Sequence, residues 1–211
     1  SRMKWLQILK TQKRPLRFII SRILRETGIW RFFEIKKNSY SLRLHPSSLA
    51  LSLWVNKNNR DPDTEIVRGL LDPGDVYVDV GANIGQLVIE AALAVGKEGE
   101  VIAFEAHPKI ARYLSENVTR NGLSNVKIAQ AAVGQDFGWT GFSDQRSDDQ
   151  NKVVEFGLQV PMIRLGPFLE ILGKNIKLLK IDVEGFEKNV LVGLGETLKK
   201  VDCIYFEAKD S

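Results

Sequence analysis

The sequence predicts an α/β fold built on a mostly parallel sheet with helices on both faces. From Val76 onward, short apolar runs alternate with longer segments of helical pattern, the order typical of strands joined by crossover helices. A glycine-rich turn at residues 81–85 connects the first of these runs to a helix. Acidic residues follow two further runs, at Glu105 and Asp182. Because such crossovers are right-handed, the strands they join lie parallel and are buried on both faces.

Length and composition fit one such domain with an appendage. The chain has 211 residues, of which 44% are hydrophobic and 27% charged, as in folded globular proteins. Its one cysteine, Cys203, excludes an internal disulfide, and its apolar neighbours predict a structural thiol in a core strand. No apolar run is long enough to span a membrane, and arginines interrupt the N-terminal apolar stretch, so we expect no signal peptide and a cytoplasmic location.

The charge is distributed unevenly along the chain. Residues 1–37 contain 11 Lys/Arg and 2 Asp/Glu, a net charge of +9, whereas residues 38–211 contain 19 and 24, a net of −5. The sequence pI of about 9.1 therefore describes the N-terminal segment and not the body of the chain. For this reason we predict no nucleic-acid partner from the pI.

Residues 1–63 are predicted to form a basic helical leader with an accessory segment. Apolar residues recur at helical spacing with arginines between them, and four more large apolar residues follow Gly28: Leu16, Ile19, Ile20, Ile23, Leu24, Ile29, Trp30, Phe32 and Phe33. One interpretation, which we favour, is a helix packed on the main domain through Leu16, Ile20, Trp30 and Phe33. The other is peripheral membrane contact through residues 1–37, in which apolar groups enter an anionic bilayer and Lys/Arg meet its headgroups.

Residues 64–211 are predicted to form the main domain. The predicted strands are 76–80, 100–104, 126–131, 177–181 and 203–206, and the predicted helices are 64–71, 86–95, 109–121, 168–172 and 186–194. Residues 134–160, rich in Gly, Asp, Gln and Ser, contain two weak strand signals and indicate an inserted β-hairpin or loop. The chain begins with Ser1 and ends shortly after a strand, so we expect a piece of a longer protein.

The turn after the first strand is the strongest local signal. Gly81 and Gly85 allow a tight turn, and the helix that follows offers free N–H groups to a ligand. Asp79 lies at the carboxyl end of the strand, where open α/β sheets bind their ligands. The spacing differs from both the Gly-x-Gly-x-x-Gly dinucleotide turn and the P-loop. A purely structural turn is the alternative.

Acidic residues beyond two later strands extend this predicted site. Glu105 follows the second strand, where a carboxylate can accept two hydrogen bonds from a ribose diol, which predicts an adenosine-containing ligand. The neighbouring His107 is expected to be an exposed loop residue. Asp182 and Glu184 follow a later strand at the same sheet edge, where they can orient a hydroxyl and accept its proton. Alternatively, Glu184 or Glu187 only caps the next helix.

Taken in order, these segments resemble the FkbM family of methyltransferases. The resemblance covers about residues 70–208 and rests on V-D-V-G-A-N-I-G, F-E-A-H-P, N-V-K-I-A-Q-A-A-V-G, L-L-K-I-D-V-E-G-F-E and I-Y-F-E. It implies a Rossmann-like class I methyltransferase fold, S-adenosylmethionine as cofactor, and O-methylation of a sugar, glycolipid or related small-molecule acceptor. It also implies that the methionine end of the cofactor is lined by Asp79, Gly81, Asn83 and Gly85, and that Glu105 holds the ribose.

The sequence departs from the family pattern in two places. Residues 163–166 read Ile-Arg-Leu-Gly where the family has an acidic or Thr-Leu element, and the strands that normally follow I-Y-F-E are missing. No His/Asp cluster suggests a metal, so none is expected. The competing hypothesis is a non-catalytic nucleoside-binding or membrane-docked module, and the glycine spacing disfavours a nicotinamide oxidoreductase.

Overall fold

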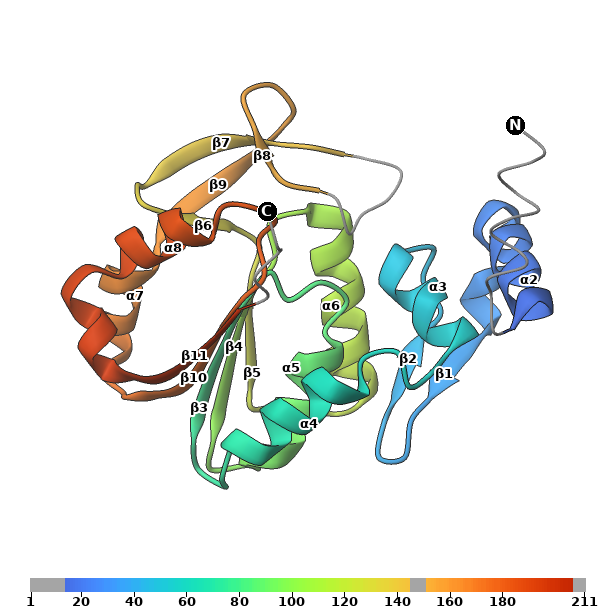
Figure 1. Cartoon of the computed structure of the whole chain (residues 1–211), viewed down its shortest axis with the longest axis horizontal. Coiled ribbons are helices and arrows are strands. Elements are labelled where there is room, and N and C mark those ends of the chain that lie inside the picture. The colour runs from blue at the N-terminus through green and yellow to red at the C-terminus, as the bar shows by residue number, and fades with distance from the viewer. Residues whose placement is uncertain (1–13, 145–150, 207–211) are drawn as a thin grey trace. The chain divides into compact units, whose positions relative to one another are not determined.

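The computed structural model describes residues 14–144 and 151–206 (Figure 1). The chain divides into two compact units, Ser1–Asp61 and Pro62–Ser211. This division falls two residues before the predicted boundary at 63/64, inside helix α4 (Asp61–Leu70). No helix among the described residues is both long and apolar enough to cross a membrane.

The N-terminal unit has a small core of its own. Helix α2 (Pro15–Thr27) and the short η1 (Ile29–Phe32) precede a hairpin of β1 (Glu34–Lys36) and β2 (Ser41–Arg43), and α3 (Ser48–Val55) follows. The buried apolar side chains are Leu24, Ile35, Tyr40, Leu42, Leu44, Ala50, Leu51 and Leu53. Helix α2 lies against α3, and its buried residues are Ser21 and Leu24.

The C-terminal unit contains the predicted parallel sheet. Its five strands are β3 (Val76–Val80), β4 (Glu100–Phe104), β5 (Val126–Ala129), β10 (Ile176–Ile181) and β11 (Val201–Phe206), in the order β11-β10-β3-β4-β5. Every neighbouring pair is parallel. The predicted fold class, a Rossmann-like α/β sheet, is confirmed.

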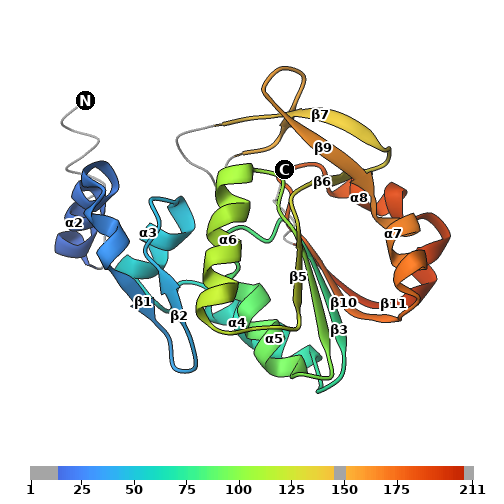
Figure 2. The ribbon, with the colours of Figure 1, turned by 180° about the vertical axis from the view of Figure 1, so that it is seen from behind.

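Helices cover both faces of this sheet (Figure 2). On one face α4, α5 (Gln86–Val95) and α6 (Pro108–Arg120) pack through a core that includes Tyr77 of β3. On the other face α7 (Leu165–Leu172) and α8 (Glu187–Leu194) pack through a second core that includes Val78. Since successive strand residues point to opposite faces, β3 is buried along its whole length. That burial fixes the loop that follows β3.

The segment predicted as a hairpin or loop forms a second sheet. It contains β6 (Ala132–Gly134), β7 (Gly138–Phe142), β8 (Val153–Val154) and β9 (Leu158–Arg164), in the order β6-β9-β7-β8. Only the β6–β9 pair is parallel, a long-range pairing that local sequence does not reveal. Figures 1 and 2 place this small sheet beyond the carboxyl ends of the parallel strands. Its inner residues pack on Ala106, beside the predicted site.

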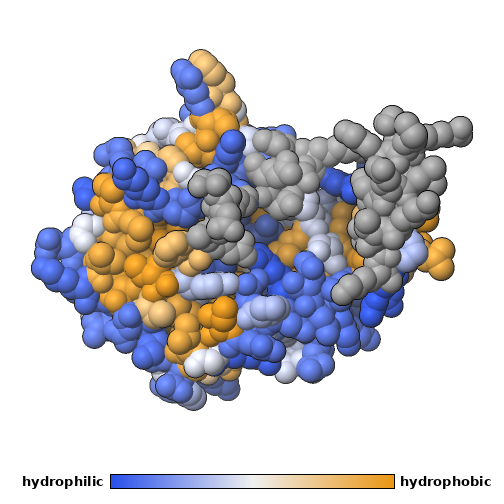
Figure 3. Space-filling model, viewed as in Figure 1, coloured by the Kyte–Doolittle hydropathy of each residue, from blue (hydrophilic) through white to orange (hydrophobic). Residues whose placement is uncertain are grey.

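Burial decreases toward β11, the outer strand of the described sheet. Its residues are half-buried or exposed, and Phe206 is 50% exposed. Figure 3 shows an apolar area on the left of the view, over β11 and α7. Cys203 was expected in the core, and it packs against the core that contains Tyr77 but is only partly buried, because among the described strands β11 has a neighbour on one side alone.

Candidate cofactor and catalytic site

The loop between β3 and α5 runs close to the loop after β10. Gly81 has a φ of +84°, and a Cβ atom on it would lie 1.9 Å from the carbonyl oxygen of Asp182. The N–H groups of Gly81 and Ala82 both donate to the carbonyl oxygen of Phe104, at the end of β4. Glycine is therefore required at position 81 both for its backbone conformation and for this close approach. The loop thus connects the ends of three strands.

Asn83 and Gly85 complete the turn into α5. Asn83 is one of two described non-glycine residues with a positive φ, and its Oδ1 accepts a hydrogen bond from the N–H of Ile84 at 2.8 Å. Asparagine tolerates this left-handed conformation because its side chain can bond the local backbone. Gly85 has a φ of +87°, and a Cβ there would overlap the side chain of Leu114. These residues set the shape of the loop at the N-terminus of α5.

Glu105 connects this loop to the end of β4. Its Oε2 accepts the N–H of Asn83 and its Oε1 accepts the N–H of His107, both at 2.9 Å. Burial raises the pKa of the Glu105 carboxyl from 4.5 to about 7, although the two hydrogen bonds partly oppose that rise. A carboxylate has about four acceptor positions. The Glu105 carboxylate can therefore accept about two further hydrogen bonds.

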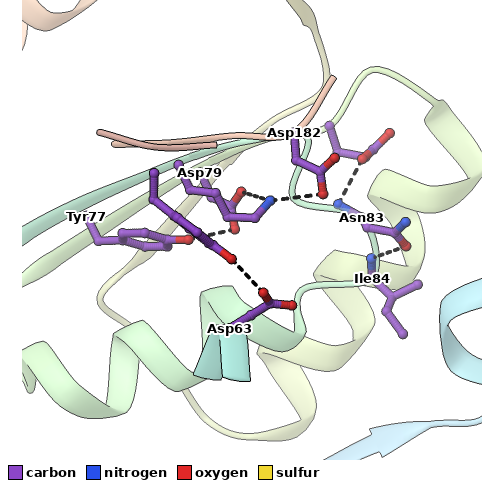
Figure 4. Close-up of polar contacts among 9 residues, drawn as sticks. Asp63, Tyr77, Asp79, Asn83, Ile84 and Asp182 are labelled. Atoms are coloured by element: carbon purple, nitrogen blue, oxygen red, sulfur yellow. Dashed lines mark hydrogen bonds and ion pairs between the residues drawn. The ribbon is translucent and has the colours of Figure 1, made fainter. Parts of the chain in front are cut away.

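Asp79 lies in a buried charge network (Figure 4). Its Oδ1 is 3.2 Å from the Nζ of Lys180, and its Oδ2 accepts the hydroxyl of Tyr77 at 3.1 Å. The side chains of Asp79 and Lys180 are 1% and 4% exposed. Both carboxylate oxygens of Asp79 thus have partners within the protein. Asp79 thus bonds Lys180 and Tyr77 near the carboxyl end of β3, and its predicted place at the methionine end of the cofactor stays a prediction.

Asp182 also forms an ion pair with Lys180. Its Oδ2 is 3.4 Å from the Lys180 Nζ, and its side chain is 22% exposed. Its N–H donates to the carbonyl oxygen of Val80, which holds the two loops together. Lys180 therefore bridges the buried Asp79 and the more accessible Asp182. The accessible carboxylate is oriented by a cation that solvent barely reaches.

Glu184 and Glu187 have different surroundings after Asp182. Glu184 is half-buried and has a φ of +47°, a conformation that is strained for glutamate. Glu187 is in the first turn of α8, and its Oε1 accepts the N–H of Gly185 at 3.0 Å. Glu187 therefore bonds the backbone just before α8, but no side chain makes a cap hydrogen bond to that helix. Glu184 remains at the sheet edge with Asp182.

His107 was expected to be exposed, and this expectation is wrong. The residue is 5% exposed, because it caps α6 and lies edge-on to Phe142 of the small sheet. Its Nδ1 accepts the N–H of Lys109 at 3.2 Å, so the ring proton of the neutral form is on Nε2. Nε2 lies 3.2 Å from a carboxylate oxygen of Asp144. His107 thus joins the site to the small sheet.

Sequence reasoning missed Lys180 and Tyr77. Lys180 interrupts the otherwise apolar end of β10, and a charge at a buried strand position indicates a buried partner. Tyr77 belongs to β3 and bonds Asp79 two residues further along. A second hydroxyl, that of Tyr205, donates to Asp63 at 2.6 Å and ties β11 to α4. Of these residues, only Lys180 could have been singled out from the sequence, because it is a charged residue in an apolar strand.

The donor and acceptor groups here fit a nucleoside with an anionic tail. Glu105 keeps acceptor positions that suit the two hydroxyls of a ribose. Helix α5 begins without a side-chain cap and without an acid in its first turn, so its N-terminal N–H groups suit a carboxylate. Among the residues that the structure describes, no group of three or more His, Cys, Asp or Glu side chains could hold a metal ion.

The fold and the polar groups of this site are those expected of an α/β domain that binds an adenosine-containing cofactor at the carboxyl edge of a parallel sheet. Residues 79–211 match the Methyltransferase FkbM domain. Since this match covers more than half of the chain, the chain belongs to the FkbM methyltransferase family. Its cofactor is S-adenosylmethionine.

Curated proteins and solved structures give further similarities. The tRNA (adenine(57)-N(1)/adenine(58)-N(1))-methyltransferase TrmI of Methanocaldococcus jannaschii is 27% identical over 120 residues, which are 56% of this chain and 39% of that protein. A probable cobalt-precorrin-6B C(15)-methyltransferase (decarboxylating) of Sulfolobus acidocaldarius is 37% identical over 57 residues, 27% of this chain and 30% of the relative. This chain therefore spans well under two thirds of the length of these curated relatives.

Two solved structures show a more distant likeness. The precorrin-6y C5,15-methyltransferase of Geobacter metallireducens GS-15 has a TM-score of 0.44 and 16% identity, over 70% of this chain and 60% of that chain. TYW2 of M. jannaschii, in complex with AdoMet, has a TM-score of 0.38 and 26% identity, over 46% of this chain and 42% of its own.

Proposed function

We propose that this chain carries the cofactor and catalytic site of an S-adenosylmethionine-dependent O-methyltransferase. The proposed acceptor is a hydroxyl of a sugar, a glycolipid or a related metabolite. The observation that carries the proposal is the position of Asp182. The backbone carbonyl oxygen of Asp182 lies against Gly81. Its carboxylate is partly exposed and is paired with the buried Lys180.

Each residue has a proposed role. Glu105 accepts hydrogen bonds from the ribose, while the 81–85 loop and the start of α5 hold the methionine end. When bound, S-adenosylmethionine supplies a methyl group that is already activated by its sulfonium. The chain therefore has to bring the hydroxyl into line and take its proton. Asp182, or Glu184 beside it, accepts that proton while the new C–O bond forms and the C–S bond breaks.

The preference for an oxygen acceptor rests on the resemblance to the FkbM family. The two curated relatives are named for methylation of adenine N1 and of a corrinoid carbon. A base nitrogen is a second candidate acceptor on those names, but the net charge of −5 over residues 38–211 does not favour a polyanionic substrate. Assays with glycan, tRNA and corrinoid acceptors distinguish these classes.

Cofactor choice is the first test. S-adenosylhomocysteine should raise the melting temperature of the purified chain, because a ligand that binds only the folded state stabilises it by mass action. NAD should leave the melting temperature unchanged. A shift with NAD and none with S-adenosylhomocysteine would overturn the proposal.

Substitution at Asp182 separates binding from chemistry. Asp182→Asn should bind S-adenosylhomocysteine within a few-fold of the unsubstituted chain, because Lys180 keeps Asp79 as its partner. Methyl transfer should fall about 100-fold or more, the usual contribution of a positioned proton acceptor. Glu184→Gln is the matched comparison, and the larger loss of turnover identifies the acceptor of the proton. If Asp182→Asn abolishes binding and leaves turnover per bound cofactor intact, the assigned roles are reversed.

A further inference from the structure

Helix α2 has one buried side and one exposed apolar side, which face different directions. Ser21 and Leu24 form the buried one, in the unit that contains α3. The second consists of Leu16, Ile19, Ile20 and Ile23, whose side chains are 38% to 75% exposed. We call these four residues the exposed α2 stripe. At 3.6 residues per turn they occupy an arc of about 100°, which excludes the positions of Ser21 and Leu24.

Arginines surround this stripe. Arg14, Arg17 and Arg22 are all exposed. Arg17 lies over the ring of Trp54 and donates to its carbonyl oxygen, and Arg22 lies over the ring of Phe18. Neither a ring nor a carbonyl oxygen neutralises a guanidinium charge. The stripe is therefore bordered by positive charge, in a segment whose net charge is +9 over residues 1–37.

Exposed apolar side chains continue directly after the helix. Ile29, Phe32 and Phe33 are 49%, 81% and 41% exposed. Large apolar groups at such exposure are costly in water when they lie close together in a small unit. Their combination with arginines is the pattern of helices that lie in the interface of a bilayer.

We propose that the exposed α2 stripe docks on the surface of an anionic lipid bilayer. The helix lies in the plane of the interface, its four aliphatic side chains enter the acyl boundary, and its arginines meet acidic headgroups. An anionic bilayer fits this surface because it offers both kinds of contact. Its acidic headgroups pair with the arginines, and its acyl chains surround the apolar stripe. The inference does not depend on the proposed methyl transfer, and the two can fail separately.

Sedimentation with vesicles tests the proposal on the full chain. The protein should pellet with vesicles that contain phosphatidylserine, remain in solution with pure phosphatidylcholine, and be released by high salt, which screens the arginines. The double substitution Ile20→Glu/Ile23→Glu should abolish pelleting. The control is Ile171→Glu on α7, where an 87% exposed isoleucine of the other unit is replaced in the same way and pelleting should persist.

Two double substitutions that each remove two positive charges test the role of the arginines. Arg14→Gln/Arg22→Gln should lower the partition coefficient about tenfold or more, since each basic residue near an anionic surface contributes about 1 kcal/mol. Lys97→Gln/Lys188→Gln removes the same charge from exposed positions of the C-terminal unit and should change little. S-adenosylhomocysteine binding, measured alongside, should be the same in all variants.

Two results would overturn the inference. If the stripe covers the other unit or a second copy of the chain, Ile20→Glu/Ile23→Glu will lower the melting temperature or the oligomer size, and vesicles will not pellet the unsubstituted protein. If the arginines alone cause association, the Ile20→Glu/Ile23→Glu protein will still pellet.

Discussion

Because we propose that Glu105 holds the ribose, we expect its raised pKa to make cofactor affinity dependent on pH near neutrality. The carboxyl is buried, and its pKa is raised to about 7. Ribose hydroxyls donate to the ionised carboxylate far better than to the protonated acid, since charge-assisted hydrogen bonds are roughly twice as strong as neutral ones. A ligand that needs the ionised form must therefore bind more weakly as the pH falls through about 7.

The expected size of the effect follows from this pKa. One pH unit below it, about one Glu105 in eleven is ionised, and one unit above it about ten in eleven are. If only the ionised form binds, the affinity rises about tenfold between pH 6 and pH 8. The stability of the protein without ligand changes with pH in the opposite direction. A raised pKa contributes stability below pH 4.5 that is lost as the pH rises through about 7, in total about 3 kcal/mol.

Calorimetry with 5′-methylthioadenosine measures this dependence. The ligand has the ribose diol but no group that ionises near neutral pH, so its own titration does not contribute. Glu105→Gln should abolish the dependence and weaken binding, because one oxygen that accepts an N–H is replaced by a donor. Glu98→Gln, at an exposed position of the same unit, should preserve the dependence.

Two outcomes would refute the reasoning. An affinity that is constant between about pH 6 and about pH 8 would show that Glu105 does not titrate there or does not hold the ribose. A dependence that persists in Glu105→Gln would assign the titration to another group.

Two further predictions concern the architecture of the site. Gly81→Ala should destabilise the protein in urea by about 2 kcal/mol or more beyond Gly74→Ala, because both glycines have positive φ but only Gly81 faces a carbonyl oxygen at 1.9 Å; equal losses would deny that close approach. Lys180→Met should cost about 3–5 kcal/mol by leaving Asp79 charged and buried, and Asp79→Asn in the same chain should restore part of that loss. Additive losses in this double-substitution cycle would mean that the two residues are not coupled.

The periodic elements of the central sheet were predictable because each has a strong local pattern. The bounds of β3, α5 and β4 agree with prediction to the residue. The polar residues of the predicted site lie beyond the ends of β3, β4 and β10, because parallel strands place their carboxyl ends at one edge.

The features that could not be predicted from the sequence depend on contacts between segments that are far apart in the chain. β6 has three residues and pairs with β9 about thirty positions later, so no local periodicity marks it. The burial of His107 depends on Phe142 from that same sheet. The ion pair between Asp79 and Lys180 could not be assigned either, because spacing along the chain does not say which acid a buried lysine meets.

The order of the strands also determines when the site can form. Asp79 and Lys180 are 101 positions apart, and β10 pairs directly with β3. During synthesis β3 and its helices are complete long before β10 emerges, so that side of β3 is an open edge and Asp79 lacks its lysine. Parallel pairings of such long range are slow to form, and open strand edges invite aggregation. Because charged residues at strand edges oppose aggregation, we expect Asp79 to protect this edge until β10 brings Lys180 to it.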